Sequence, residues 1–234
     1  MSNGRNITVD PPKAISYAGA AAYDSKAQLY FDGARRDYIA ELPGDRNARI
    51  LEIGCSGGET GAIALAEGKC GHYCGVEMFE RAAEKARGKI SHLLHGNIET
   101  LELPWDPETF DVLIMSEVLE HLADPWAVLR KLRPLLKPGA RIFASSPNIS
   151  HYRIIAMLIR GQWTLTDMGI MDRTHLRWFT PAAYRGLFES CDYRVDSVRE
   201  HQPFSNKAKI VNALTFGQFK HLFMAQVDLR AHRP

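Results

Sequence analysis

A glycine-rich turn near residue 54 is the feature that most constrains how this chain folds. Residues 49–53 read Arg-Ile-Leu-Glu-Ile, and Gly54-Cys55-Ser56-Gly57-Gly58 follows at once. Glycine adopts positive φ at little cost and lets backbone come close to a ligand. A strand that ends in such a turn and leads into a helix directs unpaired N–H groups at whatever is bound there. We therefore expect a ligand site at this turn.

The residues around the turn restrict the ligand. A dinucleotide-binding turn follows G-x-G-x-x-G, and its middle glycine brings backbone against a pyrophosphate. Here Ser56 holds that middle position, no basic residue lies in the turn, and Glu52 stands two residues before Gly54. A carboxylate at this place favours a cationic ligand over a pyrophosphate. A nicotinamide-dependent oxidoreductase stays open as an alternative.

Strand-like and helix-like segments alternate after the turn, which predicts an α/β fold with a parallel sheet covered on both faces. The expected strands are 49–53, 72–77, 91–95, 110–115, 140–145, 193–200 and 223–232, and the expected helices are 59–67, 79–88, 124–136 and 181–189. Ligands in such sheets gather at the carboxyl ends of the strands.

The chain of 234 residues suits one domain with a sizeable core. Residues 1–45 are predicted to form an N-terminal tail and helices, and residues 46–234 the main domain. Segments near 149–180 and 201–222 interrupt the alternation, so we expect them to be insertions that cover the pocket.

Five segments, taken in order, resemble the motifs of class I S-adenosylmethionine-dependent methyltransferases: Glu52–Gly58, Tyr73–Glu77, His95–Glu99, Phe110–Leu122 and Leu136–Asn148. The resemblance implies a doubly wound, seven-stranded, mostly parallel sheet with an antiparallel edge strand. It also implies S-adenosylmethionine as cofactor. Ser56 departs from the family, which usually has a second glycine there.

The resemblance assigns cofactor contacts residue by residue. It places Glu52, Gly54 and Gly58, with Cys55 and Ser56 between them, beside the methionine part. Glu77 would hold the ribose hydroxyls at the end of the second strand. The remaining expected contacts are Met78, Asn97 and Ile98 around the adenine, and Ser116, Glu117 and His121 on the floor.

Methyl transfer from a sulfonium requires mainly that the acceptor be aligned and its proton removed. His175 is the predicted base, and His151 is the second candidate because it follows the fifth strand. The segment Asp172–Thr180 resembles one in methyltransferases found beside glycosyltransferases and, more loosely, in quinone O-methyltransferases. This resemblance implies a small-molecule acceptor, a hydroxyl of a sugar or sugar-linked metabolite, with quinone, phenol or nitrogen acceptors as alternatives.

Two of these candidate functional groups also have a purely structural interpretation. Asp172, Thr174 and His175 could form a hydrogen-bonded turn that only shapes a lid. Glu117 and His121 are spaced to share a helical face, where they could hold a cation, but a hydrogen bond is expected and no metal site is predicted. A non-catalytic nucleoside-binding module is a further alternative.

Charge and hydropathy restrict partners and location. A net charge of +2 gives no broad basic field, so no nucleic-acid partner is expected. The N-terminus lacks an apolar core of signal-peptide length, which favours a cytoplasmic location. Residues 153–163 place an apolar run between arginines, a pattern that suits an interfacial membrane helix. A lid helix packed on the pocket, or on a second subunit in a homodimer, is the preferred interpretation.

Overall fold

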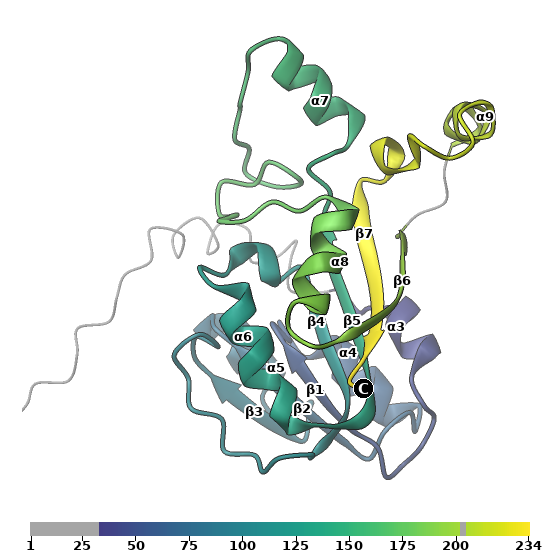
Figure 1. Ribbon diagram of the computed structural model, residues 1–234. Helices are drawn as coiled ribbons and strands as arrows, with labels where there is room; N and C mark the ends of the chain where they lie inside the picture. Colours follow the sequence, from purple (N-terminus) through teal and green to yellow (C-terminus); the bar gives the residue numbers. More distant parts are fainter. Residues whose placement is uncertain (1–32, 202–204) are drawn as a thin grey trace, which may run out of the picture.

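The computed structural model describes residues 33–201 and 205–234, and these form a seven-stranded sheet between helices (Figure 1). The strands are β1 Arg49–Ile53, β2 His72–Glu77, β3 His92–His95, β4 Phe110–Ser116, β5 Leu136–Pro147, β6 Arg194–Glu200 and β7 Gln226–His232. The helices are α3 Arg36–Glu41, α4 Glu59–Ala66, α5 Glu80–Ala86, α6 Pro125–Leu132, α7 Tyr152–Ile159, α8 Pro181–Glu189 and α9 Asn206–Leu214. Single 3₁₀ turns are η1 Leu119–His121, η2 Arg133–Leu135 and η3 Lys220–Phe223.

The strand order is β3-β2-β1-β4-β5-β7-β6. Strands β1 to β5 pair in parallel, whereas β7 runs antiparallel to both β5 and β6. The predicted doubly wound, mostly parallel sheet is confirmed, and its one reversed strand lies second from the edge. The order reverses between β1 and β4, so the crevice at their carboxyl ends is the expected ligand position.

Two apolar clusters hold the helices to the faces of the sheet. Residues of α6 and α8, such as Leu129 and Phe188, pack on one face, and residues of α3 and α4, such as Tyr38 and Ala64, pack on the other. Most strand residues of β1 and β4 are fully buried because both faces are covered. The central strands are therefore rigid supports for the turns at their ends.

Helix α6 begins as predicted and ends early. Asp124 accepts a hydrogen bond from Ala127 N at 2.9 Å, and Pro125 occupies the first helical position. The predicted end at residue 136 is wrong, because Pro134 has no N–H to donate and the chain tightens into η2. Strand β5 then starts at Leu136, four residues before its predicted start.

The segments between β5 and α8 and between β6 and β7 carry α7, α9 and η3 beyond the carboxyl ends of the strands (Figure 1). The tail and any helix predicted before residue 33 lie outside the described residues. Among the described helices, none has the length and hydropathy to cross a bilayer.

Gly61 sets how closely α4 approaches β2. A Cβ at Gly61 would lie 2.5 Å from both the Ile90 Cγ2 and the Tyr73 ring. We expect Gly61→Ala to lower the free energy of unfolding by roughly 1–3 kcal/mol through overpacking. The matched control is Gly186→Ala in α8, where a Cβ would meet nothing within 4 Å. It should stabilise by about 0.4–1 kcal/mol. Urea unfolding of both variants measures the contrast, and equal losses would refute the packing argument.

Candidate active site

The glycine turn after β1 has a backbone that few side chains tolerate. Gly54 and Gly58 have φ of 71° and 78°, and Ser56 between them has φ of 52°. A Cβ at Gly54 would lie 2.7 Å from Val118 Cγ2. The N–H groups of Gly54 and Cys55 donate to the Val76 carbonyl at the end of β2. The turn is thus tied to the neighbouring strand, and helix α4 starts directly behind it.

Glu77 closes the other side of this turn. One carboxylate oxygen accepts from Ser56 N at 2.8 Å, and the other accepts from Phe79 N at 2.9 Å. Burial raises the pKa of Glu77, and the two backbone donors oppose that shift. Glu77, the residue predicted to bind the ribose, therefore also fixes the conformation of the glycine turn.

Glu52 lies in β1 below the turn. Its side chain is buried and accepts a hydrogen bond from the Tyr73 hydroxyl at 2.8 Å. Burial raises the pKa of Glu52 to about 7, although the bond from Tyr73 favours the charged form. In its charged form, the Glu52 carboxylate favours a cationic group bound at this end of β1.

The remaining turn and adenine-side residues differ in exposure. The Cys55 thiol is buried and packs beside Gly75, where a Cβ would lie 2.5 Å from its sulfur. Asn97 accepts a hydrogen bond from Glu99 N at 2.9 Å and so closes a turn after β3. Ile98 is buried, whereas Met78 is partly exposed at the end of β2. Because the Cys55 thiol is buried, Cys55 can contact a ligand only through its backbone.

Arg35 is a site residue that sequence reasoning missed. Its Nη1 donates to Ser116 Oγ, at the carboxyl end of β4. The same nitrogen donates to Ser145 Oγ, within β5, at 2.9 Å. Asp37 accepts from Nε and Nη2 at 2.9 and 2.7 Å, and the guanidinium lies 3.6 Å above the Tyr38 ring. Burial lowers the pKa of Arg35, but the hydrogen bond to Asp37 and the nearby charges of Asp37, Tyr38 and Asp228 together outweigh burial and raise that pKa. No motif around residue 35 signals this position.

Glu117 follows β4 with a left-handed backbone, φ 55°. Gln226 Nε2 donates to its carboxylate at 2.5 Å, and burial raises its pKa. The prediction that Glu117 and His121 share a helical face is wrong. Only the single 3₁₀ turn η1 follows, because the left-handed residue interrupts any α-helix here.

Glu120, His121 and His175 form the most distinctive polar cluster. One potential ligand atom from each lies within 4.8 Å of the other two. The two imidazole rings meet edge to face with centroids 4.8 Å apart. Glu120 is 1% exposed, and neither carboxylate oxygen has a hydrogen-bond partner in the described part of the chain. Burial, followed by repulsion from Glu117, raises the pKa of Glu120 well above its ordinary value.

Backbone carbonyls set the tautomers of both rings. His175 Nδ1 lies 3.1 Å from the Ile170 carbonyl oxygen, and His121 Nδ1 lies 3.2 Å from that of Thr174. A carbonyl only accepts, so in each neutral ring the proton sits on Nδ1 and Nε2 keeps its lone pair. The cluster can accordingly accept a proton or coordinate a divalent cation.

The hydrogen-bonded turn considered for Asp172 and Thr174 is present. Asp172 Oδ1 accepts from Thr174 N at 2.9 Å and from Thr174 Oγ1 at 2.8 Å. The Leu176 and Arg177 N–H groups then donate to the Glu120 carbonyl. This turn holds His175 against η1. A structural role for Asp172 and Thr174 is therefore compatible with a role for His175 as a base.

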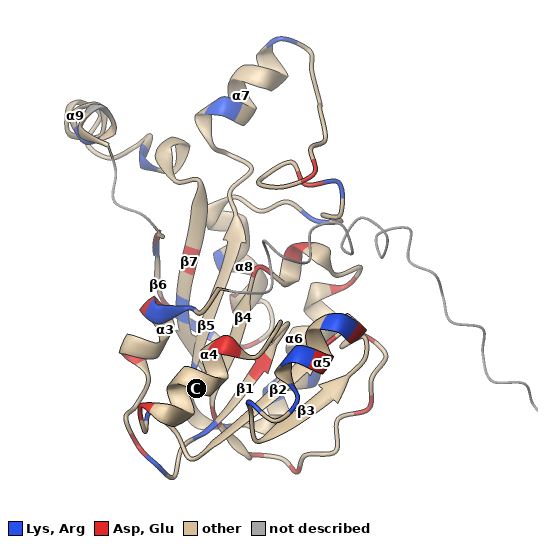
Figure 2. Cartoon of the chain, turned by 180° about the vertical axis from the view of Figure 1, so that it is seen from behind, with Lys and Arg blue, Asp and Glu red and all other residues tan. Residues whose placement is uncertain are grey.

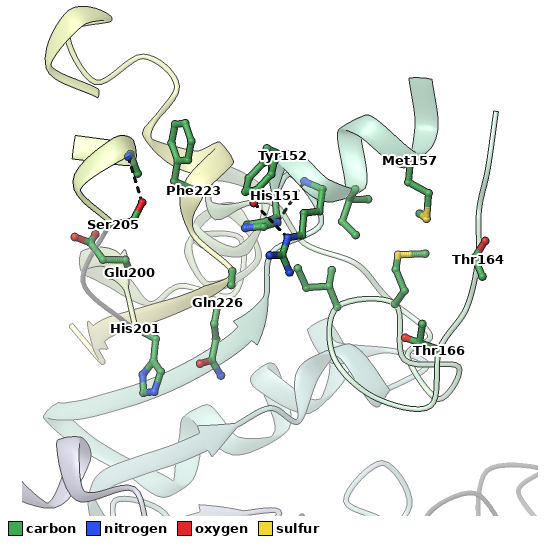
Figure 3. A pocket seen from close by; sticks show the side chains of 16 residues that line it. His151, Tyr152, Met157, Thr164, Thr166, Glu200, His201, Ser205, Phe223 and Gln226 are labelled. Carbon is green, nitrogen blue, oxygen red and sulfur yellow. Dashed lines mark hydrogen bonds between the residues drawn. The ribbon is translucent and has the colours of Figure 1, made fainter. Parts of the chain in front are cut away.

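A cavity of about 850 Å³ lies beneath α7 and next to the start of α9 (Figure 3), and Glu120, His121 and His175 are not among the residues that line it. Ile170 and Met171, from the loop that carries His175, form part of its wall. His151 also lines it, and burial lowers the pKa of that imidazole. The other lining residues are Tyr152, Arg153, Ile154, Met157, Thr164, Thr166, Glu200, His201, Ser205, Ala208, Phe223, Ala225 and Gln226.

A second group of potential ligands, Asp37, His201 and Asp228, is a poorer cation site. Arg35 already pairs with Asp37 at 2.7 Å, and Arg230 with Asp228 at 2.7 Å. Two guanidinium charges at these carboxylates disfavour an added cation. Among the described residues, the cluster around Glu120 is the better cation site.

The raised pKa of Glu52 predicts a pH-dependent stability. The folded state binds this proton more tightly than the unfolded state, so stability falls as pH rises from about 4.5 to about 7. Glu52→Gln keeps an acceptor for Tyr73 and removes the charge. At pH about 8 it should raise the free energy of unfolding by on the order of 1–3 kcal/mol. The gain should vanish toward pH about 4.5. Urea unfolding at both pH values checks it, and a pH-independent effect would contradict it.

Comparisons with known proteins agree with this geometry. A family model described as a methyltransferase domain matches residues 23–198. A ubiquinone biosynthesis O-methyltransferase of Aeromonas salmonicida is 28% identical over 190 residues, which cover 75% of this chain and 76% of that protein.

Solved structures show the same fold. A SAM-dependent methyltransferase of Archaeoglobus fulgidus has a TM-score of 0.65 at 20% identity, covering 90% of this chain and 99% of the other. A possible histamine N-methyltransferase of Thermotoga maritima has a TM-score of 0.60 at 18% identity, with 92% and 99% coverage. The glycine turn, the strand-end carboxylates and the matched family together set aside the oxidoreductase alternative. The chain belongs to the methyltransferase-domain family and is a class I S-adenosylmethionine-dependent methyltransferase.

Proposed function

We propose that this enzyme methylates a hydroxyl oxygen of a small molecule bound in the 850 Å³ cavity, and that His175 accepts the hydroxyl proton. The observation that carries the proposal is the cluster of Glu120, His121 and His175, the last of which lies on the loop whose Ile170 and Met171 line that cavity. In its neutral form, the His175 ring keeps a lone pair on Nε2 because Nδ1 donates to the Ile170 carbonyl. A general base needs that lone pair.

The residues around the glycine turn suit the cofactor. The cofactor supplies a methyl group already activated by its sulfonium. Glu77 offers a buried carboxylate for ribose hydroxyls, and Ile98 offers an apolar surface for the adenine. Arg35 donates to Ser116 and Ser145, and its guanidinium would hold the carboxylate of the amino acid end if that group replaces these serine hydroxyls as acceptor. Glu52 lies nearby with the opposite charge, so the two ends of a zwitterion have complementary partners.

The walls of the cavity favour an acceptor with an apolar part. Ile154, Met157, Met171 and Phe223 line it beside polar groups such as Gln226. Relatives are named for ubiquinone biosynthesis. Both facts support a phenolic or quinone-like ring that bears the hydroxyl. A sugar hydroxyl, expected from the segment around His175, is the second acceptor class to test.

The proton of the acceptor hydroxyl would pass to His175 Nε2 as the oxygen attacks the methyl carbon. Glu120, with a carboxylate oxygen within 4.8 Å of a ring nitrogen of His175, would stabilise the imidazolium that results. A buried carboxylate with no hydrogen-bond partner is costly unless such a positive charge arises or is bound beside it.

A divalent cation held by Glu120, His121 and His175 is the second candidate role for the cluster. Both rings donate Nδ1–H to a backbone carbonyl, the arrangement usual for histidines that ligate a metal through Nε2. The same three side chains cannot serve fully in both roles, so a chelation experiment separates them.

Glu77→Ala should weaken binding of S-adenosylhomocysteine by on the order of 1–3 kcal/mol, about 5- to 150-fold, because ribose hydroxyls lose a carboxylate partner. Isothermal titration calorimetry measures the affinity. Glu80→Ala, an exposed position three residues on, is the matched control and should bind as the parent does. Unchanged affinity in Glu77→Ala would refute the ribose assignment.

His175→Ala should lower kcat by about 10²- to 10⁴-fold and leave cofactor affinity nearly unchanged. His151→Ala is the comparison variant, since His151 lines the cavity and was the other candidate base. If His151→Ala instead abolishes turnover, the base lies there. Acceptors of the phenolic and sugar classes are screened by mass shift with the parent enzyme.

Chelation distinguishes the two roles of the cluster. After EDTA and gel filtration, turnover that persists identifies His175 as the base. Turnover that is lost and then restored by Mg²⁺, Mn²⁺ or Zn²⁺ identifies a bound cation. Calorimetric binding of that ion to the parent, absent in His121→Ala, would confirm the ligand set independently of activity.

A further inference from the structure

Helices α7 and α9 stand away from the body of the protein at the same end (Figure 1). Each touches the rest of the molecule over a small area. Ile154 is the buried residue of α7, and Ala208 is the buried residue among the described side chains of α9. Helices that short gain most of their stability from packing in soluble proteins. Packing of a partner against their outer faces would therefore stabilise both helices.

The outer faces carry large apolar side chains. On α7, Ile155, Leu158 and Ile159 follow i, i+3, i+4 spacing, and Ile159 is 81% exposed. On and after α9, Ile210, Leu214 and Phe216 are exposed, with Phe216 at 96%. Trp163, Leu165, Met168, Val211 and Phe219 are also exposed in the same two segments. Apolar exposure gathered in this way marks an interaction surface.

The charges of the two segments have one sign. Residues 149–166 and 201–225 contain five lysines and arginines and no aspartate or glutamate. Figure 2 accordingly shows blue but no red on α7 and α9. Arg153, Arg160 and Lys209 are exposed, and within residues 33–201 and 205–234 none of the three forms an ion pair. The charges on α7 and α9 themselves are basic, whereas Asp167 and Glu200, just outside these ranges, pair with Arg173 and Lys220.

We propose that α7 and α9 together dock the enzyme on an anionic phospholipid bilayer. The apolar side chains would enter the boundary between headgroups and acyl chains, while the arginines and lysines meet lipid phosphates. A second copy of the chain is a poorer occupant. A two-fold interface would set Arg153, Arg160 and Lys209 of one copy against the same residues of the other, and the flanking acids Asp167 and Glu200 already pair with Arg173 and Lys220.

The cavity lies beneath this surface. Ile154 and Met157 of α7 and Ser205 and Ala208 at the start of α9 line it. Docking would therefore bring the cavity to the bilayer, where an acceptor with an apolar tail would reside. This last step rests on the proposed function, whereas the docking itself depends only on α7 and α9.

Vesicle flotation tests the proposal with the full chain. The parent protein should float with vesicles of phosphatidylglycerol and phosphatidylcholine, and bind them at least about tenfold more tightly than phosphatidylcholine alone at about 0.1 M NaCl. Raising NaCl to about 0.5 M should weaken the binding, because basic side chains contribute. No flotation with anionic vesicles would overturn the proposal.

The double variant Ile159→Glu, Leu214→Glu adds acid on both exposed faces and should reduce anionic vesicle binding by about tenfold or more. Asn47→Glu is the control for acid placed elsewhere: it adds one negative charge, against two in the double variant, at an exposed turn before β1, at the opposite end of the sheet. It should bind vesicles as the parent does. Unchanged melting temperature and S-adenosylhomocysteine affinity in each variant would establish intact folding and an intact cofactor site.

Two results would contradict lipid docking. Equal flotation of the double variant and the parent would place the contact elsewhere on the molecule. Sedimentation velocity without vesicles that shows a parental dimer, split into monomers by the double variant, would assign the surface to a second copy. Failure of methylation with unimpaired flotation would count against the proposed function alone.

Discussion

The site depends on the bond between Glu77 and the glycine turn. The carboxylate of Glu77 accepts from Ser56 N and Phe79 N, and so joins the turn after β1 to the end of β2 at the place proposed for the nucleoside. A buried carboxylate is costly without donors, and here backbone N–H groups supply them. The bond to Ser56 N also holds that residue in a left-handed conformation, φ 52°, that residues other than glycine rarely adopt. The proposed ribose contact and the turn geometry thus share one residue.

A second group of buried charges occupies the carboxyl ends of β4 and β5. Arg35 is held by Asp37 and by two serine hydroxyls, and Glu117 is held by Gln226. Among residues 33–201 and 205–234, Glu120 has no such hydrogen-bond partner, although it is almost fully buried. A protein optimised only for stability would replace such a carboxylate with an apolar residue. Its retention beside two imidazoles agrees with a chemical role for the cluster.

Several features of this molecule could be predicted because they depend on short stretches of chain. The turn at Gly54 and the acid at Glu77 directly follow or end strands that short stretches of sequence predict. Their positions at the carboxyl ends of β1 and β2 could therefore be predicted. The role of Arg35 was not, because its partners are 81 and 110 residues away. The pairing expected for Glu117 and His121 failed since it assumed a helix, and a left-handed Glu117 replaced that helix with one 3₁₀ turn.

The amino-acid sequence by itself determined the class of fold and the cofactor family, since periodicity and turn chemistry act over a few residues at a time. It also determined that residues 149–166 and 201–225 are basic and free of acid. Only the tertiary structure decided that Glu120 and His121 meet His175, which is more than 50 residues away in the chain. Only the tertiary structure decided that α7 and α9 share one end of the molecule. Contacts between distant segments follow from how all elements pack at once, and no local pattern encodes them.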